Sequence, residues 1–380
     1  MNKSVEKAVE APFIHVVAVD DGSGNIAVAY EDEQGGYHEH SQPSLIERGV
    51  GAAFGQSGVH AWDADGERYT TKAYATNPIS TLDPDYQVSP ASRVLVNDAF
   101  TRAGLGGKLC SIGCTLPVNQ YYMPRETGDD PHNWERIKAK EDSLRKAVTS
   151  LNGTTTPPTI LHVAVYPEAI PAYIYCAYAE RAGEDREAIG EYPERHRTLV
   201  VDLGEFTADL AVLATGNEVV SYATHEHGVH KMVSHFRTAL IRDSSRLGLF
   251  DVAAMPAGDL KLAIERGYIG SDLTTPAAIA ARIDVSAQIK EAADELNRLL
   301  LEDIRTLTRG QLKSMTRVVF VGGGANLLRE HAKGWHEVVD IPNEPEAAIV
   351  RGVYLLLDQQ RESMVAEALN NMNKEATHGR

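Results

Sequence analysis

Asp20-Asp21-Gly22-Ser23-Gly24-Asn25 is the stretch that decides the fold class of this chain, because it joins two strand-like runs through an acidic, glycine-rich turn. The apolar run 14–19 precedes the turn and the run 26–30 follows it, which is the pattern of a β-hairpin. Glycines at the tip let the backbone approach an oxygen-rich ligand closely. Taken alone, such a tip is more often an ordinary hairpin turn with no ligand.

A second hairpin repeats this pattern about 180 residues later. Asp202-Leu203-Gly204-Glu205-Phe206-Thr207 lies between the apolar runs 198–201 and 210–213. Two such tips facing each other would offer N–H groups to phosphates and carboxylates to a hydrated divalent cation. The pair therefore favours a nucleoside triphosphate site divided between two hairpins, with Ser23 and Thr207 as additional hydroxyl donors.

A third glycine turn, Gly322-Gly323-Gly324, follows the buried-looking strand 318–321 and precedes a helix expected over about 325–333. A nucleotide could lie against this backbone and the helix start, although close packing of strand and helix explains many such turns. The chain has neither a Walker loop nor a G-x-G-x-x-G fingerprint after a strand, so those two kinds of nucleotide site are not expected.

Composition limits the classes of protein. The 380 residues are 43% hydrophobic and carry a formal net charge of −16, which favours a soluble two-domain protein and argues against direct binding to nucleic acid or to a membrane. The N-terminus lacks an apolar signal region, so we expect a cytoplasmic location. We expect no disulfide framework among the three cysteines, Cys110, Cys114 and Cys176, and we expect Cys110 and Cys114 to be buried on one face of a strand.

The order of elements predicts two α/β halves, each headed by one hairpin, and suggests an ancient duplication. We expect a helix over 133–151 and a longer helix capped by Ser286, whereas the run 93–96 fits either a helix or a strand. The segment 183–197 has the composition of a solvated loop. The tail from about residue 362 to 380 is polar, and we expect its end to fray.

The order of the three turns resembles the phosphate-1, phosphate-2 and adenosine motifs of the actin, Hsp70 and sugar-kinase superfamily. Further stretches resemble one branch, the ParM (StbA) family of actin-like ATPases that segregate low-copy plasmids. The likeness runs, with gaps, from about residue 13 to about 358. The stretches that carry it are Cys114-Thr115-Leu116-Pro117 with Tyr121-Tyr122, Pro167-Glu168-Ala169-Ile170-Pro171-Ala172, and 349–354 around Gly352.

The resemblance implies a two-lobed actin-like fold with duplicated ribonuclease-H-like domains and a nucleotide in the interdomain cleft. On this basis the first domain spans 12–182, with the C-terminal helix 344–362 returning to it, and the second spans 198–343. The implied activity is ATP hydrolysis, with Mg²⁺ as cofactor and GTP as the alternative nucleotide, coupled to self-assembly into filaments. The implied partner is a centromere-binding adaptor of the ParR type.

The same resemblance implies roles for individual residues. Asp20 and Asp202 would hold Mg²⁺ through water, and Glu168 would position or activate the attacking water. The alternative for Glu168 is an exposed loop acid without a catalytic role. Asp209 could orient the site from behind. The implied nucleotide-binding residues are Asp21, Gly22, Ser23, Gly24, Asn25, Gly204, Glu205, Phe206, Thr207, Gly228, Gly322, Gly323, Gly324, Ala325 and, on the helix with Arg136, Lys138.

This chain departs from the family pattern at two points. Ala27 stands where the first hairpin usually carries a lysine, and Glu205-Phe206 replace the middle pair of a Gly-Gly-Thr-Thr sequence in the second hairpin. An acid beside phosphates is costly unless it faces a metal or solvent. Backbone N–H groups do most of the phosphate binding in such turns, so these departures affect the expected hydrolysis rate more than binding.

Two other interpretations are open at this stage. A metabolic phosphotransferase of the same superfamily would also use the three turns, but it would need a pocket for a small hydroxyl compound. The histidines at 225, 227, 230 and 235 suggest zinc, yet no cysteine or H-E-x-x-H sequence accompanies them. We therefore favour surface or adenosine-pocket packing for this histidine cluster.

Overall fold

The structure, a computed structural model, describes residues 12–50, 59–72, 77–123, 130–151, 153, 155–179 and 196–378. These residues form two compact units. Unit 1 draws on 1–116, 123–167 and 350–380, and unit 2 on 117–122 and 168–349. The expected loop 183–197 lies outside the described residues up to residue 195. Within the described part of the chain, no helix is long and apolar enough to span a membrane.

Unit 1 is built on a five-stranded sheet in the order β3-β2-β1-β7-β9. The strands β1, β2 and β3 form an antiparallel meander, and β7 and β9 extend it in parallel from β1. The predicted first hairpin is β1–β2. A second sheet has the order β4-β6-β5-β8. The strands are β1 (His15–Asp21), β2 (Asn25–Glu31), β3 (Tyr37–Pro43), β4 (Ile46–Arg48), β5 (His60–Ala64), β6 (Glu67–Thr71), β7 (Leu109–Leu116), β8 (Thr149–Ser150) and β9 (Thr159–Pro167).

Helices pack against this sheet. The run 93–96, which by sequence fits either a helix or a strand, is helical and lies within α1 (Pro90–Phe100), which Ser89 caps. The helix expected over 133–151 is α3 (Trp134–Arg145), capped by Asn133 and shorter than predicted because β8 follows it. Helix α11 (Ala348–Gln359) lies so close to β7 that a Cβ on Gly113 would come within 2.8 Å of Leu357.

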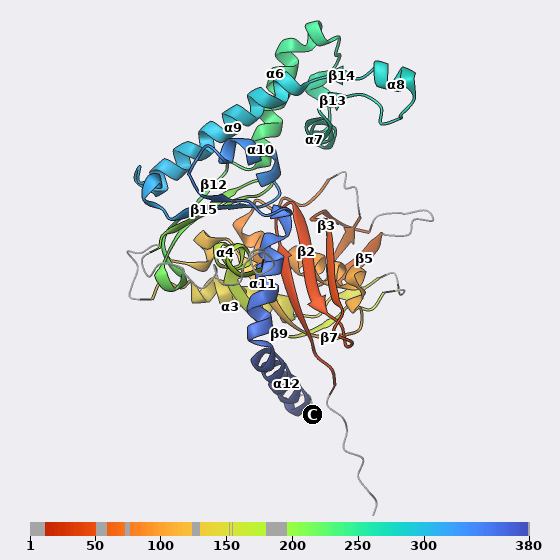
Figure 1. Cartoon of the computed structure of the whole chain (residues 1–380). Helices are drawn as coiled ribbons and strands as arrows, with labels where there is room; N and C mark the ends of the chain where they lie inside the picture. The colour runs from red at the N-terminus through yellow and green to blue at the C-terminus, as the bar shows by residue number, and fades with distance from the viewer. Residues whose placement is uncertain are drawn as a thin grey trace, which may run out of the picture. The chain divides into compact units, whose positions relative to one another are not determined.

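The polar C-terminal tail is helical over most of its length. Residues Arg361–His378 form helix α12, which continues below α11 in Figure 1 and contacts β1, β7 and β9. Ala368 is fully buried against Ile14 and Leu161. The sequence of α12 is polar on average, but its apolar side chains recur at helical spacing, and burial of that stripe stabilises the helix.

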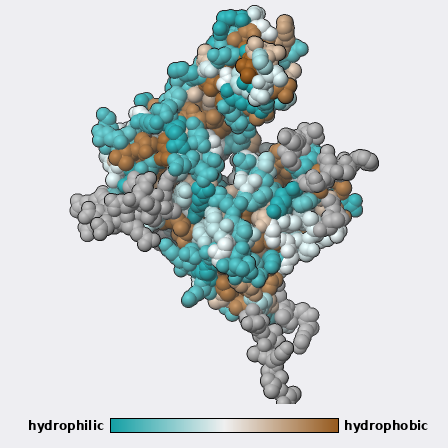
Figure 2. Space-filling view, turned by 45° about the vertical axis from the view of Figure 1, so that its right-hand side comes forward, coloured by the Kyte–Doolittle hydropathy of each residue, from teal (hydrophilic) through white to brown (hydrophobic). Residues whose placement is uncertain are grey.

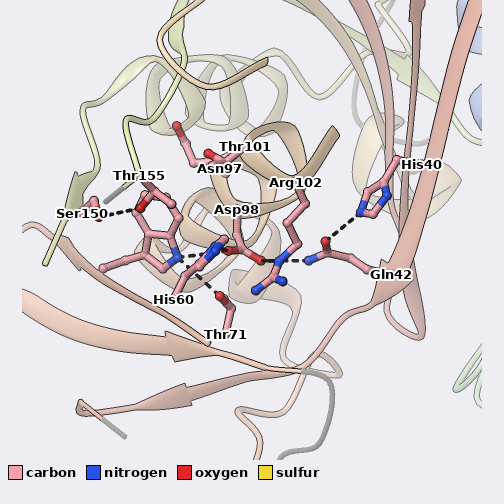
Figure 3. A network of polar contacts seen from close by, with 11 residues as sticks. His40, Gln42, His60, Thr71, Asn97, Asp98, Thr101, Arg102, Ser150 and Thr155 are labelled. Carbon is pink, nitrogen blue, oxygen red and sulfur yellow. Dashed lines mark hydrogen bonds and ion pairs between the residues drawn. The ribbon is translucent and has the colours of Figure 1, made fainter. Parts of the chain in front are cut away.

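A buried polar network joins the parts of unit 1 (Figure 3). Asp98 of α1 has no exposed surface and accepts hydrogen bonds from Arg102 at 2.7 Å and Gln42 at 3.0 Å, while His60 contacts it at 2.6 Å. Burial raises the pKa of Asp98, but the bonds from His60 and Arg102 outweigh it and lower the pKa to about 2. Because β3, β5 and α1 all contribute, this carboxylate ties both sheets to one helix.

Unit 2 repeats the plan of unit 1. Its sheet has the order β12-β11-β10-β15-β16, with an antiparallel meander of three strands and two parallel strands added beside β10. The same order and directions occur in the sheet of unit 1, so the topology confirms the duplication that the sequence only suggests. The strands are β10 (Thr198–Leu203), β11 (Ala208–Ala214), β12 (Glu218–His225), β15 (Arg317–Val321) and β16 (Val339–Asp340).

Helices α6 (Val229–Leu247), α9 (Ser286–Leu307) and α10 (Ala325–Ala332) enclose one face of this sheet. Leu199, Val201 and Leu203 of β10 belong to that core, so the alternation of a strand directs Asp202 to the opposite face. Ser286 is the first residue of α9 and not its cap; the carboxylate of Asp284 accepts its N–H instead. Figure 1 shows α6 and α9 side by side above the sheet, and Figure 2 shows that the outward surface there is largely hydrophilic with separate apolar patches.

Candidate functional site

The second hairpin of unit 2 forms as predicted. Its strands β10 and β11 pair Asp202 with Asp209, and the tip closes with a bond of 2.9 Å from the N–H of Gly204 to the carbonyl of Thr207. Asp202 is 9% exposed at the end of a strand that is otherwise buried. The hairpin thus carries a carboxylate beside a turn whose glycine lets the backbone approach a ligand closely.

The triple glycine lies against this hairpin. Gly322 follows β15, which runs parallel to β10 and pairs Val321 with Asp202. Gly322 has φ +88°, and a Cβ there would lie 2.2 Å from Oδ1 of Asp202. Gly324 donates its N–H to the carbonyl of Leu203 at 2.9 Å, and a Cβ on it would lie 2.5 Å from the Leu203 side chain. Any larger residue at either position would push the two motifs apart.

The start of α6 is the third element that meets the hairpin. A Cβ on Gly228 would come within 2.4 Å of the carbonyl carbon of Phe206. The N–H groups of Gly228, Val229 and His230 donate to the carbonyls of Phe206, Gly204 and Glu205, respectively, at 3.1, 3.0 and 2.9 Å. Because the C=O and N–H of a trans peptide point in opposite directions, the N–H groups of residues 205–207 are directed away from α6. This orientation leaves them suited to an anion.

Glu205 is neutralised by a residue that the sequence did not single out. Its carboxylate pairs with Nζ of Lys261 at 2.5 Å, from helix α7 (Ala257–Arg266). Phe206 packs its ring 5.5 Å from that of His230. The two departures in this hairpin are therefore accommodated inside unit 2, and the charge of Glu205 faces an ammonium group.

Asp209 and Thr207 form a small network beneath the tip. The hydroxyl of Thr207 donates to one Asp209 oxygen at 2.9 Å, and that of Thr224 donates to the other at 2.6 Å. Burial raises the pKa of Asp209, and these two bonds oppose the rise. Asp209 thus accepts a hydrogen bond from the Thr207 hydroxyl, and its role behind the site stays a prediction.

The first hairpin, in unit 1, also has the carbonyl groups of its tip bound by neighbouring residues. Ser44 binds the carbonyl of Gly22 through its hydroxyl at 2.6 Å and that of Gly24 through its N–H at 2.9 Å, and the Thr81 hydroxyl binds the carbonyl of Ser23 at 3.2 Å. By the same peptide geometry, the N–H groups of Ser23 and Gly24 point away from Ser44 and Thr81. Asn25 begins β2 with an exposed side chain.

A buried lysine lies beneath this hairpin. Nζ of Lys140, which is fully buried on α3, donates to the carboxylate of Asp21 and to the amide oxygen of Gln87. Asp20 stands next to this pair, and burial of its carboxyl group, followed by the charge of Asp21, raises its pKa to about 7 against the opposing effect of Lys140. Shifts of this kind are concentrated at functional sites.

Lys138, the lysine of α3 that the resemblance assigns to the nucleotide, is a surface residue. Lys138 points to the surface, where it pairs with Asp142 at 3.0 Å and its side chain is 71% exposed. Ala27 is buried within β2, opposite Ser41, so the hairpin has no cation at that position. Lys140 supplies a positive charge two residues beyond Lys138, and the spacing of Ile137, Lys140 and Leu144 on one helical face is the signal that could have identified it.

Glu168 is 8% exposed and stands immediately before helix α4 (Ala169–Ile174). It is therefore not the exposed loop acid of the alternative interpretation. Within unit 2, α4 contacts β10, β11 and β15, the strands that lead to Asp202 and Gly322. Its catalytic role stays a prediction.

The remaining nucleotide-site candidates lie where the turn begins α10. Ala325 is buried and donates its N–H to the carbonyl of Gly322 at 3.1 Å. A Cβ on Gly323 would meet nothing within 4 Å, so this residue faces open space. Three predicted motifs of unit 2 thus meet near Asp202, namely the second hairpin, the triple glycine and the start of α6. The first hairpin belongs to unit 1. Sequence reasoning missed Ser44, Thr81, Lys140 and Lys261, which all act from distant positions in the chain.

Comparisons with known proteins place the fold of this chain among actin-like proteins. The family model for the N-terminal part of the plasmid segregation protein ParM matches residues 15–178, and that for the C-terminal part of the archaeal MreB-like actin homologue matches 200–334. No curated protein matches the chain significantly.

Several solved structures similar to this chain are of actin-like proteins. The archaeal actin homologue Ta0583 in complex with ADP is 17% identical with a TM-score of 0.66, covering 91% of this chain and 100% of that one. A ParM from a 15-stranded filament of Clostridium botulinum is 16% identical with a TM-score of 0.63, over 91% and 99% of the two chains. The actin-like protein Alp7A is 14% identical with a TM-score of 0.64, over 97% and 99%. These likenesses confirm the predicted fold.

Proposed function

We propose that this actin-like protein, whose N-terminal half is of the ParM type, binds and hydrolyses ATP and uses the nucleotide to control its own polymerisation. The observation that carries the proposal is the convergence of Asp202, the second hairpin and Gly322. Glycine is required at this contact because a Cβ on Gly322 would overlap the Asp202 carboxylate. Such close packing of backbone around a carboxylate suits a ligand that combines phosphates with a cation.

The backbone of the two tips would bind the phosphates. In unit 2, N–H groups of 205–207 point away from α6, and in unit 1, those of Ser23 and Gly24 point away from Ser44 and Thr81. A Mg²⁺ ion held through water by Asp20 and Asp202 would neutralise phosphate charge during transfer. The residues fit that ion, because the pKa of the half-buried Asp20 carboxyl is raised beside the buried Asp21, and a cation would stabilise its charged form.

Glu168 would act on water. A carboxylate beside the attacking water accepts a hydrogen bond or a proton from it, and the burial of Glu168 holds that carboxylate in one place. We expect Glu168→Gln to keep nucleotide affinity within about twofold and to slow hydrolysis about 100-fold, the size typical of a lost acid–base residue. Glu330→Gln, at a surface pair with Lys333, is the control.

Equal hydrolysis rates of Glu168→Gln and Glu330→Gln would remove Glu168 from the mechanism. A large loss of nucleotide affinity in Glu168→Gln alone would give it a binding role instead. Measuring both affinity and phosphate release separates these outcomes.

Polymerisation is proposed on the similarity to ParM, since a ParM of Clostridium botulinum forms a 15-stranded filament. Plasmid partition is proposed on the same basis, with a ParR-type adaptor that binds the centromere-like DNA. The net charge of −16 favours such an adaptor over direct contact with DNA. A cytoplasmic location of the protein is part of the same proposal.

A metabolic phosphotransferase is the rival class. Sedimentation of the full chain with Mg–ATP, Mg–GTP, ADP or no nucleotide distinguishes the two. We expect the chain to pellet with Mg–ATP and to stay in the supernatant with ADP. Phosphate transfer to a small hydroxyl compound without any pelleting would overturn the filament proposal in favour of the rival.

A further inference from the structure

Two histidines and a buried aspartate of unit 2 meet beside the second hairpin. His225 is the last residue of β12, His227 lies in the turn before α6, and Asp303 belongs to α9. One nitrogen or oxygen atom of each residue lies within 4.8 Å of the other two. We propose that these three side chains bind a divalent transition metal ion of the zinc class.

The distances suit such an ion. Bonds of 2.0–2.2 Å in tetrahedral geometry separate neighbouring ligand atoms by about 3.4 Å. Nδ1 of His225 already lies 3.4 Å from Oδ1 of Asp303. Nδ1 of His227 lies 2.6 Å from Oδ2 of Asp303, a hydrogen bond that has to lengthen by about 0.8 Å to admit the metal. Rotations of two partly exposed imidazoles supply that change.

Hydrogen bonding alone does not account for His225. Its Nδ1 contact with Asp303 is long, and its buried Nε2 has no hydrogen-bond partner among the described residues. Asp303 is 6% exposed, and the ion pairs found for its carboxylate within the described part of the chain are with these two imidazoles. A buried carboxylate needs a positive partner, and a cation between the three side chains supplies one.

The donor set selects the kind of cation. Two imidazole nitrogens and one carboxylate oxygen suit zinc and its neighbours, whereas magnesium and calcium prefer oxygen ligands alone. Three protein ligands leave the fourth tetrahedral position to water. This site is therefore chemically distinct from the magnesium expected at Asp20 and Asp202, and it does not depend on the proposed function.

The metal ion would hold the turn between β12 and α6 in place. His227 directly precedes Gly228, whose N–H holds the carbonyl of Phe206 in the hairpin tip. Binding at His225 and His227 joins β12 and the start of α6 to α9, so an ion that binds only the folded state raises the stability of unit 2. The sequence could not show this, because Asp303 is 76 residues from His227.

The test uses the untagged full chain, stripped of metal with a chelator and titrated with Co²⁺ and then with Zn²⁺. We expect one equivalent of Co²⁺ to bind with visible absorption typical of a tetrahedral site, and Zn²⁺ to displace it. We expect His227→Ala and Asp303→Asn each to lower Co²⁺ affinity at least about 100-fold, since even changes to residues behind a metal's ligands cost 10- to 100-fold. Circular dichroism of each variant establishes that it is folded.

His331→Ala is the matched control, because it removes another histidine–aspartate contact, 2.8 Å to Asp294, in the same unit. The chain has 14 histidines, so surface binding must be separated from the site. We expect the control to bind Co²⁺ as the natural chain does, and Zn²⁺ to raise the melting temperature of both. Absence of stoichiometric binding to the natural chain, or equal affinity in His227→Ala, Asp303→Asn and the control, would overturn the proposal.

Discussion

Replacing Gly322 with alanine perturbs the contact on which the nucleotide site depends. The new Cβ would lie 2.2 Å from Oδ1 of Asp202 and 2.6 Å from the carbonyl oxygen of Leu203. Carbon and oxygen atoms do not approach below about 3.0 Å, so the Asp202 side chain and the end of β10 must move by several tenths of an ångström. We expect this movement to turn the carboxylate away from its position in the site.

The cost has two parts. A non-glycine residue at φ +88° costs about 1–2 kcal/mol, and overpacking beside a buried strand adds about 1–3 kcal/mol. The total of about 2–5 kcal/mol lowers the melting temperature by roughly 2–4 °C per kcal/mol for a unit of this size. Differential scanning calorimetry measures the shift, and calorimetric titration with Mg–ATP measures affinity, which we expect to fall at least about tenfold.

Gly310→Ala separates backbone strain from the clash. Gly310 has φ +75°, but a Cβ there meets nothing within 4 Å. We expect this control to lose about 1–2 kcal/mol and to keep full Mg–ATP affinity. If Gly322→Ala is no more destabilised than Gly310→Ala and binds Mg–ATP equally well, the argument from the Asp202 contact is refuted.

Three further predictions, one of them with a control substitution, test other contacts. Lys140→Met leaves a buried carboxylate unpaired and should cost about 3–5 kcal/mol, measured by urea unfolding, whereas Lys108→Met at a surface pair should change stability by less than about 1 kcal/mol. Lys261→Ala exposes the phosphate region to the charge of Glu205 and should weaken Mg–ATP binding roughly tenfold in the same titration; unchanged affinity would contradict this. The pKa of Asp98 is lowered to about 2 in the folded chain, so about 2 kcal/mol of stability is present above pH 4 and is lost as the pH falls toward 2. In Asp98→Asn that part of the pH dependence should disappear from unfolding curves.

Much of the fold followed from local pattern. Apolar runs bounded by Asp-Gly turns predicted both hairpins, and the buried run 318–321 before the triple glycine predicted β15 and α10. These elements are decided by neighbouring residues, so a sequence displays them. The helix Arg361–His378 does not stand out in the sequence, because its average polarity conceals the apolar stripe around Ala368 that unit 1 buries.

The sequence predicts the glycine turns and the aspartates of the candidate site. It does not predict the side chains that pair with them. Glycines and aspartates at 20–24, 202–204 and 322–324 identify themselves by type and order. The partners that neutralise or orient them come from distant elements: Lys261 reaches Glu205 from α7, and Lys140 reaches Asp21 from 119 residues away. Such pairs depend on tertiary packing, which no local pattern reports.

Light scattering and phosphate release, recorded together in one sample of the full chain after addition of Mg–ATP, test the central claim most directly. We expect scattering to rise before phosphate appears and to fall as the ATP is consumed, and we expect Glu168→Gln to reach the same scattering and hold it. Phosphate release with no rise in scattering, or scattering that does not respond to the nucleotide, would contradict the account.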